Sequence, residues 1–374
     1  MLDFLPFTRP TIDDETIAEV VAVLRSGWIT SGPKVLELER ALAAYLGGER
    51  QLRVMTSATG AMEMALRAAG VGAGDEVVVP AMSFAASANV VVRVGARPVF
   101  IDVELRSRNA SPAAFAAALT PRTRALMPVH VSGLAVDMDP VNALARAKGL
   151  RVVEDAAHAI GTRYRGRLSG SFGDIVSFSF HANKNLTTIE GGALSFADPA
   201  LALPLDRERF HGITKDAAGN VDVYEAGGKY NLTDVAAAVG LGQLRRLAGF
   251  NARRGELARH YFARLGTRLD PDMLPPPDDA GHSWHMFTVL VPFGRLGYTR
   301  DDFIARMKAR GIGIGVHYPS IPGLTYYRQL GWDPAALPNA ARIGAETVTL
   351  PLFPAMASGD VDRVCDALLE LVKR

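Results

Sequence analysis

A single lysine, Lys184, lies between a β-rich run and a pair of glycines in the stretch FHANKNLTTIEGG, residues 180–192. The residues before it, GDIVSFSF, are typical of a buried strand, so Ser179 and Lys184 are expected at the same end of that strand. An amine that is partly removed from water has a lowered pKa, and it can act as a nucleophile and carry protons. The alternative is an ordinary surface lysine in a loop.

A carboxylate ends another predicted strand. The stretch VVEDAAHAIG, residues 152–161, places Asp155 at the end of a hydrophobic run and His158 one helical turn further on. Such a carboxylate could keep a ring nitrogen protonated, because a nearby opposite charge favours the charged form. An aspartate that caps a helix and a hydrogen-bonded core histidine are the alternatives.

Two further strand ends offer groups that suit a phosphate and a flat ring. In TSATGAM, residues 56–62, a strand leads into a helix, and the hydroxyls of Ser57 and Thr59 accompany the free N–H groups of the helix start. Phe84 follows the strand EVVVP and could stack on a planar cofactor. Helix capping and a core phenylalanine are the alternatives. Together, a phosphate cradle, an aromatic plate, a ring-directed carboxylate and a reactive amine predict a pyridoxal phosphate site.

These candidates depend on elements that bring strand ends together. From residue 11 to about 215, helical patterns such as ATGAMEMALRAA alternate with β-rich runs such as LRVVEDA. This alternation predicts an α/β fold with a mostly parallel sheet, and ligands collect at the carboxyl ends of the strands in such sheets. We expect a large cofactor-binding domain over residues 1–250 and a smaller α+β domain over residues 251–374. The boundary lies between two successive helical patterns, LTDVAAAVGLGQLRRL and NARRGELARHYFARLG.

Composition limits the classes of partner. There are 41 Lys and Arg against 39 Asp and Glu, and the basic residues are scattered, so no nucleic-acid-binding surface is indicated. No run reaches the roughly 18 uninterrupted apolar residues of a membrane span, and MLDFLPFTRP lacks the pattern of a signal peptide. We therefore expect a cytoplasmic protein that acts on small molecules and binds no metal. The one cysteine, Cys365, is expected in the apolar stripe of a helix.

In this order and spacing, the motifs resemble the DegT/DnrJ/EryC1/StrS family of nucleotide-sugar aminotransferases over nearly the whole chain. The matching stretches are SGWITSGPKVLELE, TSATGAMEMAL, GDEVVVPAMSF, VEDAAHAIGTRYRGRLSGSFGDIVSFSFHANKNLTTIEGG, YNLTDVAAAVGLGQL, SWHMF and LPLFP. The resemblance implies the aspartate-aminotransferase fold (fold type I), pyridoxal 5′-phosphate as cofactor, and ping-pong transfer of an amino group. The expected donor is an amino acid, usually glutamate, and the expected acceptor is a keto sugar on a nucleotide.

The resemblance also implies roles for single residues. Lys184 would bind the cofactor covalently, Asp155 would pair with the pyridine nitrogen, and His158 would lie near the phenolic oxygen. Further cofactor contacts are implied at four positions, which are Thr59, Gly60 and Ser179 at the phosphate and Phe84 against the ring. Asn231, in KYNLTD, matches an asparagine that reaches the cofactor phosphate of the neighbouring subunit, which implies a homodimer with shared active sites. By sequence alone, Asn231 could equally be a helix cap.

The sugar is less closely defined. FLPFTRP, GWITSGPK and KYNLTD look most like the family members that aminate UDP-4-keto-L-arabinose to UDP-4-amino-4-deoxy-L-arabinose for lipid A modification in lipopolysaccharide biosynthesis. ITKDAAGNVDVYEAGG and GIGIGVHYPSIPGLTYYRQLG differ from those enzymes, so a 4-keto-6-deoxyhexose nucleotide is the alternative. Ile189 stands where many relatives have glycine. Residues that could line the sugar-nucleotide pocket, unless they only pack in the small domain, are Trp28, Thr30, His317, Tyr318 and Arg328.

Three rival functions are weaker. A branch of the family dehydrates sugars with a histidine in place of the cofactor lysine, and Lys184 argues against it. A regulator that binds pyridoxal phosphate without catalysis would usually carry a fused DNA-binding domain, whereas the family pattern begins within the first ten residues here. A nicotinamide-dependent oxidoreductase would need a glycine-rich turn from strand into helix, but the glycines of AAGVGAGDEVVV run from helix into strand.

Overall fold

Seven strands form the central sheet. The computed structural model describes residues 4–277 and 281–373. The strands are β1 (Gln51–Met55), β2 (Glu76–Pro80), β3 (Arg97–Ile101), β4 (Thr123–Leu126), β5 (Arg151–Asp155), β8 (Ile175–Ser179) and β9 (Gly192–Phe196). They lie in the order β1-β9-β8-β5-β4-β2-β3, in which β9 runs antiparallel to β1 and β8 and every other pair is parallel. The predicted α/β fold with a mostly parallel sheet is thereby confirmed.

This topology brings several polar strand ends to one edge of the sheet. Asp155 is the last residue of β5, and Ser179 is the last residue of β8. Ser57 follows β1, and Phe84 lies four residues beyond the end of β2. Because β1, β2, β5 and β8 run in the same direction, their carboxyl ends meet at the same edge, where ligands bind in open α/β sheets.

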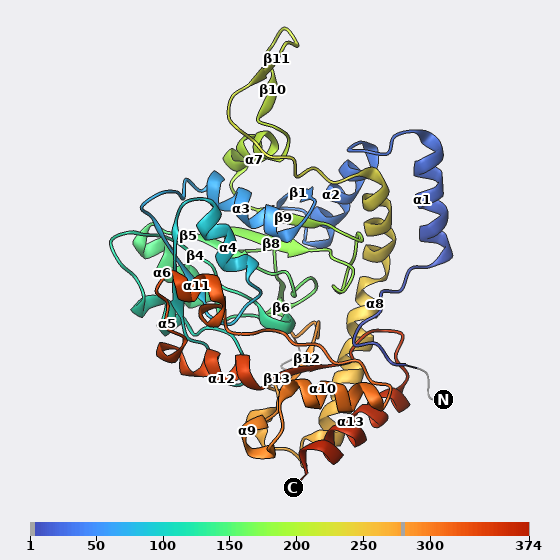
Figure 1. The fold of residues 1–374 in the computed structure, drawn as a ribbon. Helices are drawn as coiled ribbons and strands as arrows, with labels where there is room; N and C mark the ends of the chain where they lie inside the picture. Colours follow the sequence, from blue (N-terminus) through green and yellow to red (C-terminus); the bar gives the residue numbers. More distant parts are fainter. Residues whose placement is uncertain (1–3, 278–280, 374) are drawn as a thin grey trace.

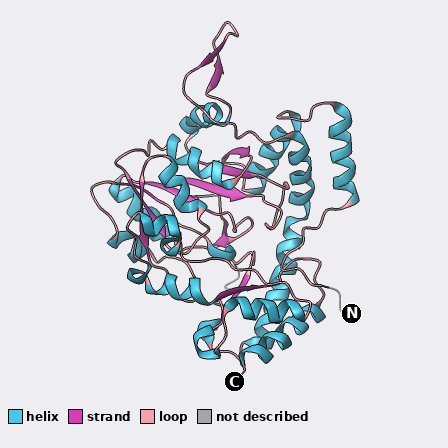
Figure 2. Ribbon diagram, viewed as in Figure 1, coloured by secondary structure: helices cyan, strands magenta, loops and turns pink. Residues whose placement is uncertain are grey.

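Helices cover both faces of the sheet (Figures 1 and 2). They are α2 (Pro33–Tyr45), α3 (Ala58–Ala68), α4 (Ala86–Arg93), α5 (Pro112–Ala117), α6 (Met138–Lys148) and α7 (Ala202–Arg209). The first helix, α1 (Asp14–Ser26), packs instead against the long helix α8 (Asp234–Leu265). Successive residues of β8 pack into different clusters, with Ile175 on the face of α3 and Val176 and Phe178 on the face of α2. A strand buried on both faces needs an unbroken apolar run, which explains why the sequence of β8 shows no clear alternation.

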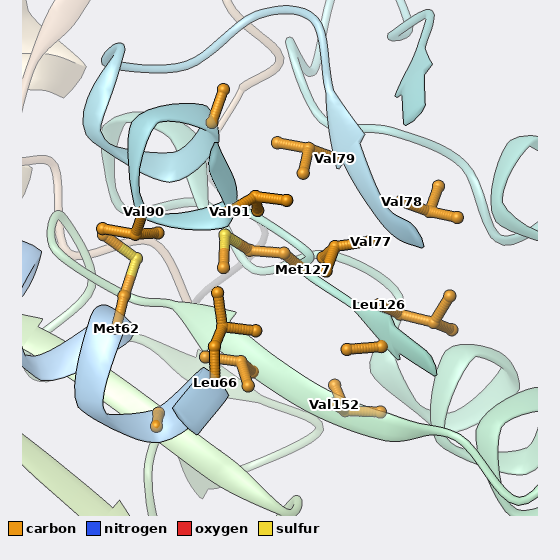
Figure 3. Close-up of a cluster of buried hydrophobic side chains, with 14 of the residues drawn as sticks. Met62, Leu66, Val77, Val78, Val79, Val90, Val91, Leu126, Met127 and Val152 are labelled. Atoms are coloured by element: carbon orange, nitrogen blue, oxygen red, sulfur yellow. The ribbon is translucent and has the colours of Figure 1, made fainter. Parts of the chain in front are cut away.

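The largest cluster of apolar side chains lies between α3, α4 and the parallel strands (Figure 3). Met62 and Leu66 of α3 face Val90 and Val91 of α4, and all four side chains are almost fully buried. The valines of β2, together with Leu126 of β4 and Val152 of β5, complete the cluster. This packing holds the start of α3 and the start of α4 against the carboxyl edge of the sheet.

The smaller part of the protein is an α+β unit. It contains β12 (Phe287–Leu290) paired antiparallel with β13 (Thr347–Leu350), and the helices α9 (Phe293–Leu296), α10 (Arg300–Ala309), α11 (Thr325–Gln329), α12 (Pro338–Glu346) and α13 (Ser358–Val372). Cys365 is fully buried in α13, as predicted. Leu5, near the amino end of the described chain, packs into the core of this unit.

One long helix, α8 (Asp234–Leu265), joins the two parts (Figure 1). The two helical patterns predicted around residue 250 are therefore a single helix, and the predicted boundary between residues 250 and 251 falls inside it. Leu241 and Leu247 pack in a cluster of the large part, whereas Leu257 and Tyr261 pack in the core of the small part. Tyr327, in α11, returns to the main cluster of the large part.

Two short hairpins complete the fold. One consists of β6 (Arg163–Tyr164) and β7 (Arg167–Leu168), and the other of β10 (Ile213–Lys215) and β11 (Val221–Val223). The β10–β11 hairpin projects from the body of the molecule beyond α7 (Figure 1). Within the described ranges, no helix is both long enough and apolar enough to cross a membrane.

Candidate active site

A cavity of about 370 Å³ opens at the carboxyl edge of the sheet. Its walls come from the start of α3, the loop between β2 and α4, the ends of β5 and β8, and the segment before α11. Eight of the predicted site residues line it, which are Thr59, Phe84, Asp155, His158, Ser179, Lys184, His317 and Tyr318. Residues more than 250 positions apart in the chain thus share one site.

Lys184 lies in a turn between β8 and β9. Its backbone N–H donates a hydrogen bond to the carbonyl of His181 (2.9 Å), which closes the turn and directs the side chain to the cavity. Burial of the amine lowers the pKa of Lys184 to about 8, although the carboxylate of Asp155 acts in the opposite direction. An amine with this pKa is partly unprotonated near neutral pH, as a nucleophile or proton carrier must be.

Both carboxylate oxygens of Asp155 accept a hydrogen bond. The backbone N–H of Ala157 donates to Oδ1 (3.1 Å), and the hydroxyl of Ser87 donates to Oδ2 (2.6 Å). The side chain is only 4% exposed. The segment after β5 is a series of turns, so the expectation that His158 lies one helical turn beyond Asp155 is wrong. Asp155 therefore caps no helix, and its carboxylate faces the cavity.

His158 is held in one tautomer by its neighbours. The backbone N–H of Ser132 donates to Nδ1 (3.3 Å), so the ring proton lies on Nε2, which donates to the hydroxyl of Tyr318 (3.1 Å). Burial lowers the pKa of His158 well below its ordinary value, with further contributions from Lys184 and His317. The ring also stacks on that of His285 at 4.6 Å. His158 is thus a neutral hydrogen-bond donor on the cavity wall.

The start of α3 presents backbone donors to the cavity. The hydroxyl of Ser57 caps the helix by accepting the N–H of Gly60 (3.0 Å), which is the ordinary role considered for this residue. Ala58 and Thr59 line the cavity, and first-turn N–H groups have no partner inside a helix. Gly60 does not line the cavity. A Cβ at Gly60 would lie 2.9 Å from the ring of Tyr230, so glycine permits close packing there.

The opposite wall is aromatic. Phe84 is 57% exposed, and its ring lies 5.5 Å from that of Tyr318. Burial raises the pKa of the Tyr318 hydroxyl, which stays protonated at physiological pH. His317 Nδ1 lies 2.8 Å from the hydroxyl of Thr349, and burial lowers the pKa of His317 to about 4. These rings are neutral, so this wall offers stacking surface and hydrogen bonds.

Besides Gly60, four predicted residues do not line this cavity. Trp28 is 66% exposed, and Thr30 is also exposed, with its carbonyl bonded to the start of α8. Arg328 is exposed on α11. Asn231 donates from its amide to the hydroxyl of Ser31 (2.6 Å), and it accepts a hydrogen bond from the amine of Lys229. The roles predicted for these four residues stay predictions.

Several cavity residues were missed from the sequence. His181, Asn183 and Glu190 line the cavity beside Lys184, and Nδ1 of His181 lies 2.8 Å from the side-chain oxygen of Asn183. Their position within FHANKNLTTIEGG was the available signal. Ser83, the residue before Phe84, also lines the cavity. It carried no signal, because a serine after a strand is common in loops.

Ile189 has a backbone conformation that glycine adopts more easily. Its φ is +73°, and its side chain is 54% exposed. A β-branched residue at positive φ is strained, which gives a physical reason for glycine at this position in relatives. The backbone N–H of Ile189 donates to the hydroxyl of Thr187 (2.8 Å), which helps to hold the conformation.

The fold and site define a class of protein. An open mixed α/β sheet, with a helix start, an aspartate and a partly desolvated lysine at one cavity on its carboxyl edge, is the arrangement of pyridoxal-phosphate enzymes of fold type I.

Comparison with known proteins gives the family. The family model of the DegT/DnrJ/EryC1/StrS aminotransferase family matches residues 10–369. Spr1654 of Streptococcus pneumoniae, named as a sugar aminotransferase and solved in its PMP form, is 33% identical, with a TM-score of 0.92 over 98% of this chain and 99% of that one. The aminotransferase TlmJ of Streptoalloteichus hindustanus is 34% identical, with a TM-score of 0.89 over 98% of each chain. Helicobacter pylori PseC, an aminotransferase involved in the biosynthesis of pseudoaminic acid, is 27% identical, with a TM-score of 0.91 over 99% of each chain. The chain belongs to the DegT/DnrJ/EryC1/StrS aminotransferase family, and it is an enzyme.

Pyridoxal 5′-phosphate is the cofactor of these enzymes, and the residues of the cavity fit it. The start of α3 and Ser179 offer donors for a phosphate, Asp155 offers an acceptor for a ring N–H, and Phe84 offers an exposed ring face. Lys184 lines the same cavity. Within the described part of the chain, no group of three or more His, Cys, Asp or Glu side chains could hold a metal ion.

Proposed function

We propose that the enzyme transfers an amino group from an amino acid, with L-glutamate as first choice, to the 4-keto group of a nucleotide-linked sugar. The observation that carries this proposal is the meeting of Lys184 and Asp155 in one cavity of a chain that belongs to an aminotransferase family. The bound cofactor supplies an electron-accepting ring that carries the amino group from donor to acceptor.

The residues of the cavity have different roles in the proposed reaction. Lys184 binds the cofactor, and its amine moves the proton at the α-carbon of the amino donor, for which its pKa of about 8 is suited. Asp155 accepts the ring N–H and keeps that nitrogen protonated. His158 donates a hydrogen bond near the phenolic oxygen.

Binding of the cofactor falls to residues at the edge of the sheet. The hydroxyls of Thr59 and Ser179 and the N–H groups of α3 bind the phosphate, while Phe84 covers the ring. Gly60 acts chiefly by letting Tyr230 pack against α3. A direct contact of Gly60 with the phosphate stays a prediction, since its N–H already donates to the capping hydroxyl of Ser57.

We further propose a homodimer with shared active sites. Asn231 lies outside the cavity of its own chain, and its side chain is bonded to Ser31 at the surface. The exposed Trp28 and Ile29 precede Ser31, so apolar surface adjoins Asn231. A second copy of the chain that covers this surface would receive Asn231, Trp28 and Thr30 at its cavity. This arrangement explains why these predicted residues are absent from the cavity of one chain.

UDP-4-keto-L-arabinose is the first choice of sugar, because FLPFTRP, GWITSGPK and KYNLTD resemble the enzymes that use it. The product would then serve lipid A modification in lipopolysaccharide biosynthesis, and the enzyme would work in the cytoplasm. The second candidate is a 4-keto-6-deoxyhexose nucleotide. His317 and Tyr318, on the cavity wall, belong to one of the segments that differ from the arabinose enzymes, so the sugar pocket differs where the substrate would bind.

A half-reaction screen tests the proposal. The holoenzyme is converted to its amino form with L-glutamate, excess glutamate is removed, and 4-keto nucleotide sugars are added singly while the absorbance of the bound cofactor is followed. Return of the starting spectrum with UDP-4-keto-L-arabinose alone supports the first candidate. Return only with a 4-keto-6-deoxyhexose nucleotide supports the second. A spectrum that responds to no amino acid and no keto sugar overturns the proposed transamination.

A further inference from the structure

Two buried hydroxyls lie in line behind the carboxylate of Asp155. The Ser87 Oγ lies 2.6 Å from Asp155 Oδ2, and the Ser83 Oγ lies 2.7 Å from the Ser87 Oγ. The exposed fraction is 0% for Ser87 and 3% for Ser83. Neither residue was predicted as part of the site.

The direction of the hydrogen bonds follows from the number of protons. A carboxylate only accepts, so Ser87 donates its one proton to Asp155. The carbonyl of Phe84, at 3.3 Å from the Ser87 Oγ, is the more distant of its two acceptors. Ser83 must then donate its hydroxyl proton to Ser87. Ser83 lines the cavity, and its hydroxyl oxygen keeps its lone pairs as acceptors.

The local fold places these hydroxyls. Ser87 is the second residue of α4, and Ser83 lies in the loop three residues before the helix begins, where the bend of the chain brings its hydroxyl within 2.7 Å of that of Ser87. Val90 and Val91 anchor α4 in the main cluster of the large part (Figure 3). The packing of α4 thus sets the position of the hydroxyls relative to the end of β5.

We propose that Ser87, supported by Ser83, is a positioning residue that holds Asp155 ionised and fixes the rotation of its carboxylate. This inference rests on the proposed pairing of Asp155 with the ring nitrogen. Among the described residues, Asp155 forms no ion pair with Arg, Lys or His within 4.0 Å, so the donors of Ser87 and Ala157 are the groups that contact its oxygens directly, while Lys184 acts on its charge at longer range. Donors to a carboxylate favour its charged form. In the proposed pair, one proton lies between the carboxylate of Asp155 and the ring nitrogen of the cofactor. A well-stabilised carboxylate leaves this proton on the ring nitrogen, whereas a poorly stabilised carboxylate draws it toward itself.

The test is ¹⁵N NMR of the holoenzyme loaded with pyridoxal phosphate labelled at the ring nitrogen. The variants are Ser87→Ala, Ser87→Thr, Ser83→Ala and Asp155→Asn. Ser177→Ala is the matched control, because Ser177 is also a fully buried serine and pairs with Asp155 across β5 and β8, but its hydroxyl donates to the carbonyl of Ala58.

We expect Ser87→Ala to move the ring-nitrogen resonance toward the value of an unprotonated pyridine and to slow the half-reaction with glutamate about tenfold to a hundredfold. Ser87→Thr keeps a hydroxyl and should restore both readouts. Ser83→Ala should move the resonance in the same direction by less, and it carries the test if Ser87→Ala does not fold. Ser177→Ala should leave the resonance unchanged.

The possible failures are distinguishable. If Asp155→Asn leaves the resonance where it is in the wild-type enzyme, the proposed pairing of Asp155 with the ring is wrong, and the proposed function loses its support. If Asp155→Asn moves the resonance but neither Ser87→Ala nor Ser83→Ala moves it beyond the Ser177→Ala control, the role of the two serines is overturned while the proposed function stands.

Discussion

Nε2 of His158 donates a hydrogen bond to the hydroxyl of Tyr318 across 3.1 Å, which joins residues that are 160 positions apart in the chain. His158 follows β5 of the large part, whereas Tyr318 belongs to the segment that returns from the small part. The bond therefore ties the two parts together over the cavity.

Replacing Tyr318 with phenylalanine removes the acceptor of this bond and keeps the ring. One buried hydrogen bond contributes about 1 kcal/mol, so we expect roughly a fivefold loss in kcat/KM and weaker retention of the cofactor on dialysis. Tyr298→Phe is the control, because it loses a hydroxyl bond to the carbonyl of Leu371 within the small part. Equal effects of the two variants on kcat/KM would contradict a role for Tyr318 at the site.

The pKa of Lys184 makes the stability of the cofactor-free protein depend on pH. Burial lowers this pKa from its ordinary value of 10.5 to about 8. Between these values the unfolded chain binds more protons than the folded one, so the contribution of Lys184 to stability rises with pH. Lys184→Met removes this contribution. Relative to the wild type, the variant should be most stabilised below about pH 8, and the difference should shrink toward about pH 10.5. Urea unfolding at several pH values measures it, and a difference independent of pH would refute the lowered pKa.

Two glycines, one beside the site and one on α8, differ in the space that is available for an alanine side chain. A Cβ at Gly192 would lie 2.4 Å from the backbone of Ser57 and 2.5 Å from that of Ala58, so Gly192→Ala should destabilise the protein by about 1–3 kcal/mol or more. Gly249 is exposed in α8 with nothing within 4 Å, so Gly249→Ala should stabilise it by about 0.5–1 kcal/mol. Thermal unfolding compares the two variants, and a tolerated alanine at Gly192 would show that the start of α3 can move away from β9.

Replacing Ile189 with glycine should relieve backbone strain. The positive φ costs about 1–3 kcal/mol for a residue other than glycine, and the greater freedom of glycine in the unfolded chain offsets about 0.5–1 kcal/mol of that. We expect a net stabilisation of about 1 kcal/mol in urea unfolding. Ile189→Val keeps the β-branch and should leave stability nearly unchanged. A less stable Ile189→Gly variant would mean that the isoleucine side chain packs against something, such as a second subunit.

Shared active sites predict that two inactive variants can complement each other. Lys184→Ala removes the cofactor lysine, and Asn231→Asp alters the residue that we place at the cavity of the other subunit. When subunits of the two variants are mixed and exchanged, hybrid dimers contain one site with both residues intact, so part of the activity should return. The experiment requires that Asn231→Asp alone is impaired. A mixture as inactive as its components, or a monomer in light scattering, would count against the shared site.

The sequence alone identified much of the central site. Lys184, Asp155 and Phe84 were predicted because each lies at or just beyond the end of a recognisable strand, and the carboxyl ends of parallel strands meet at one edge. The continuous helix α8 was predicted in two pieces, and α4 was not predicted. Its sequence, ASANVVVR, is rich in valine, which favours strands, and only packing against α3 and β2 makes it a helix.

The tertiary structure alone decided the relationships between distant segments of the chain. No local pattern indicates that Ser87 donates to Asp155, that Tyr318 accepts from His158, or that Asn231 lies outside the cavity of its own chain. Periodicity and turn residues report on neighbours within about one helical turn or one strand, because they reflect local backbone preferences. Partners across the site are set by how helices pack on the sheet and by where the chain returns from the small part, and these depend on the packing of the whole core.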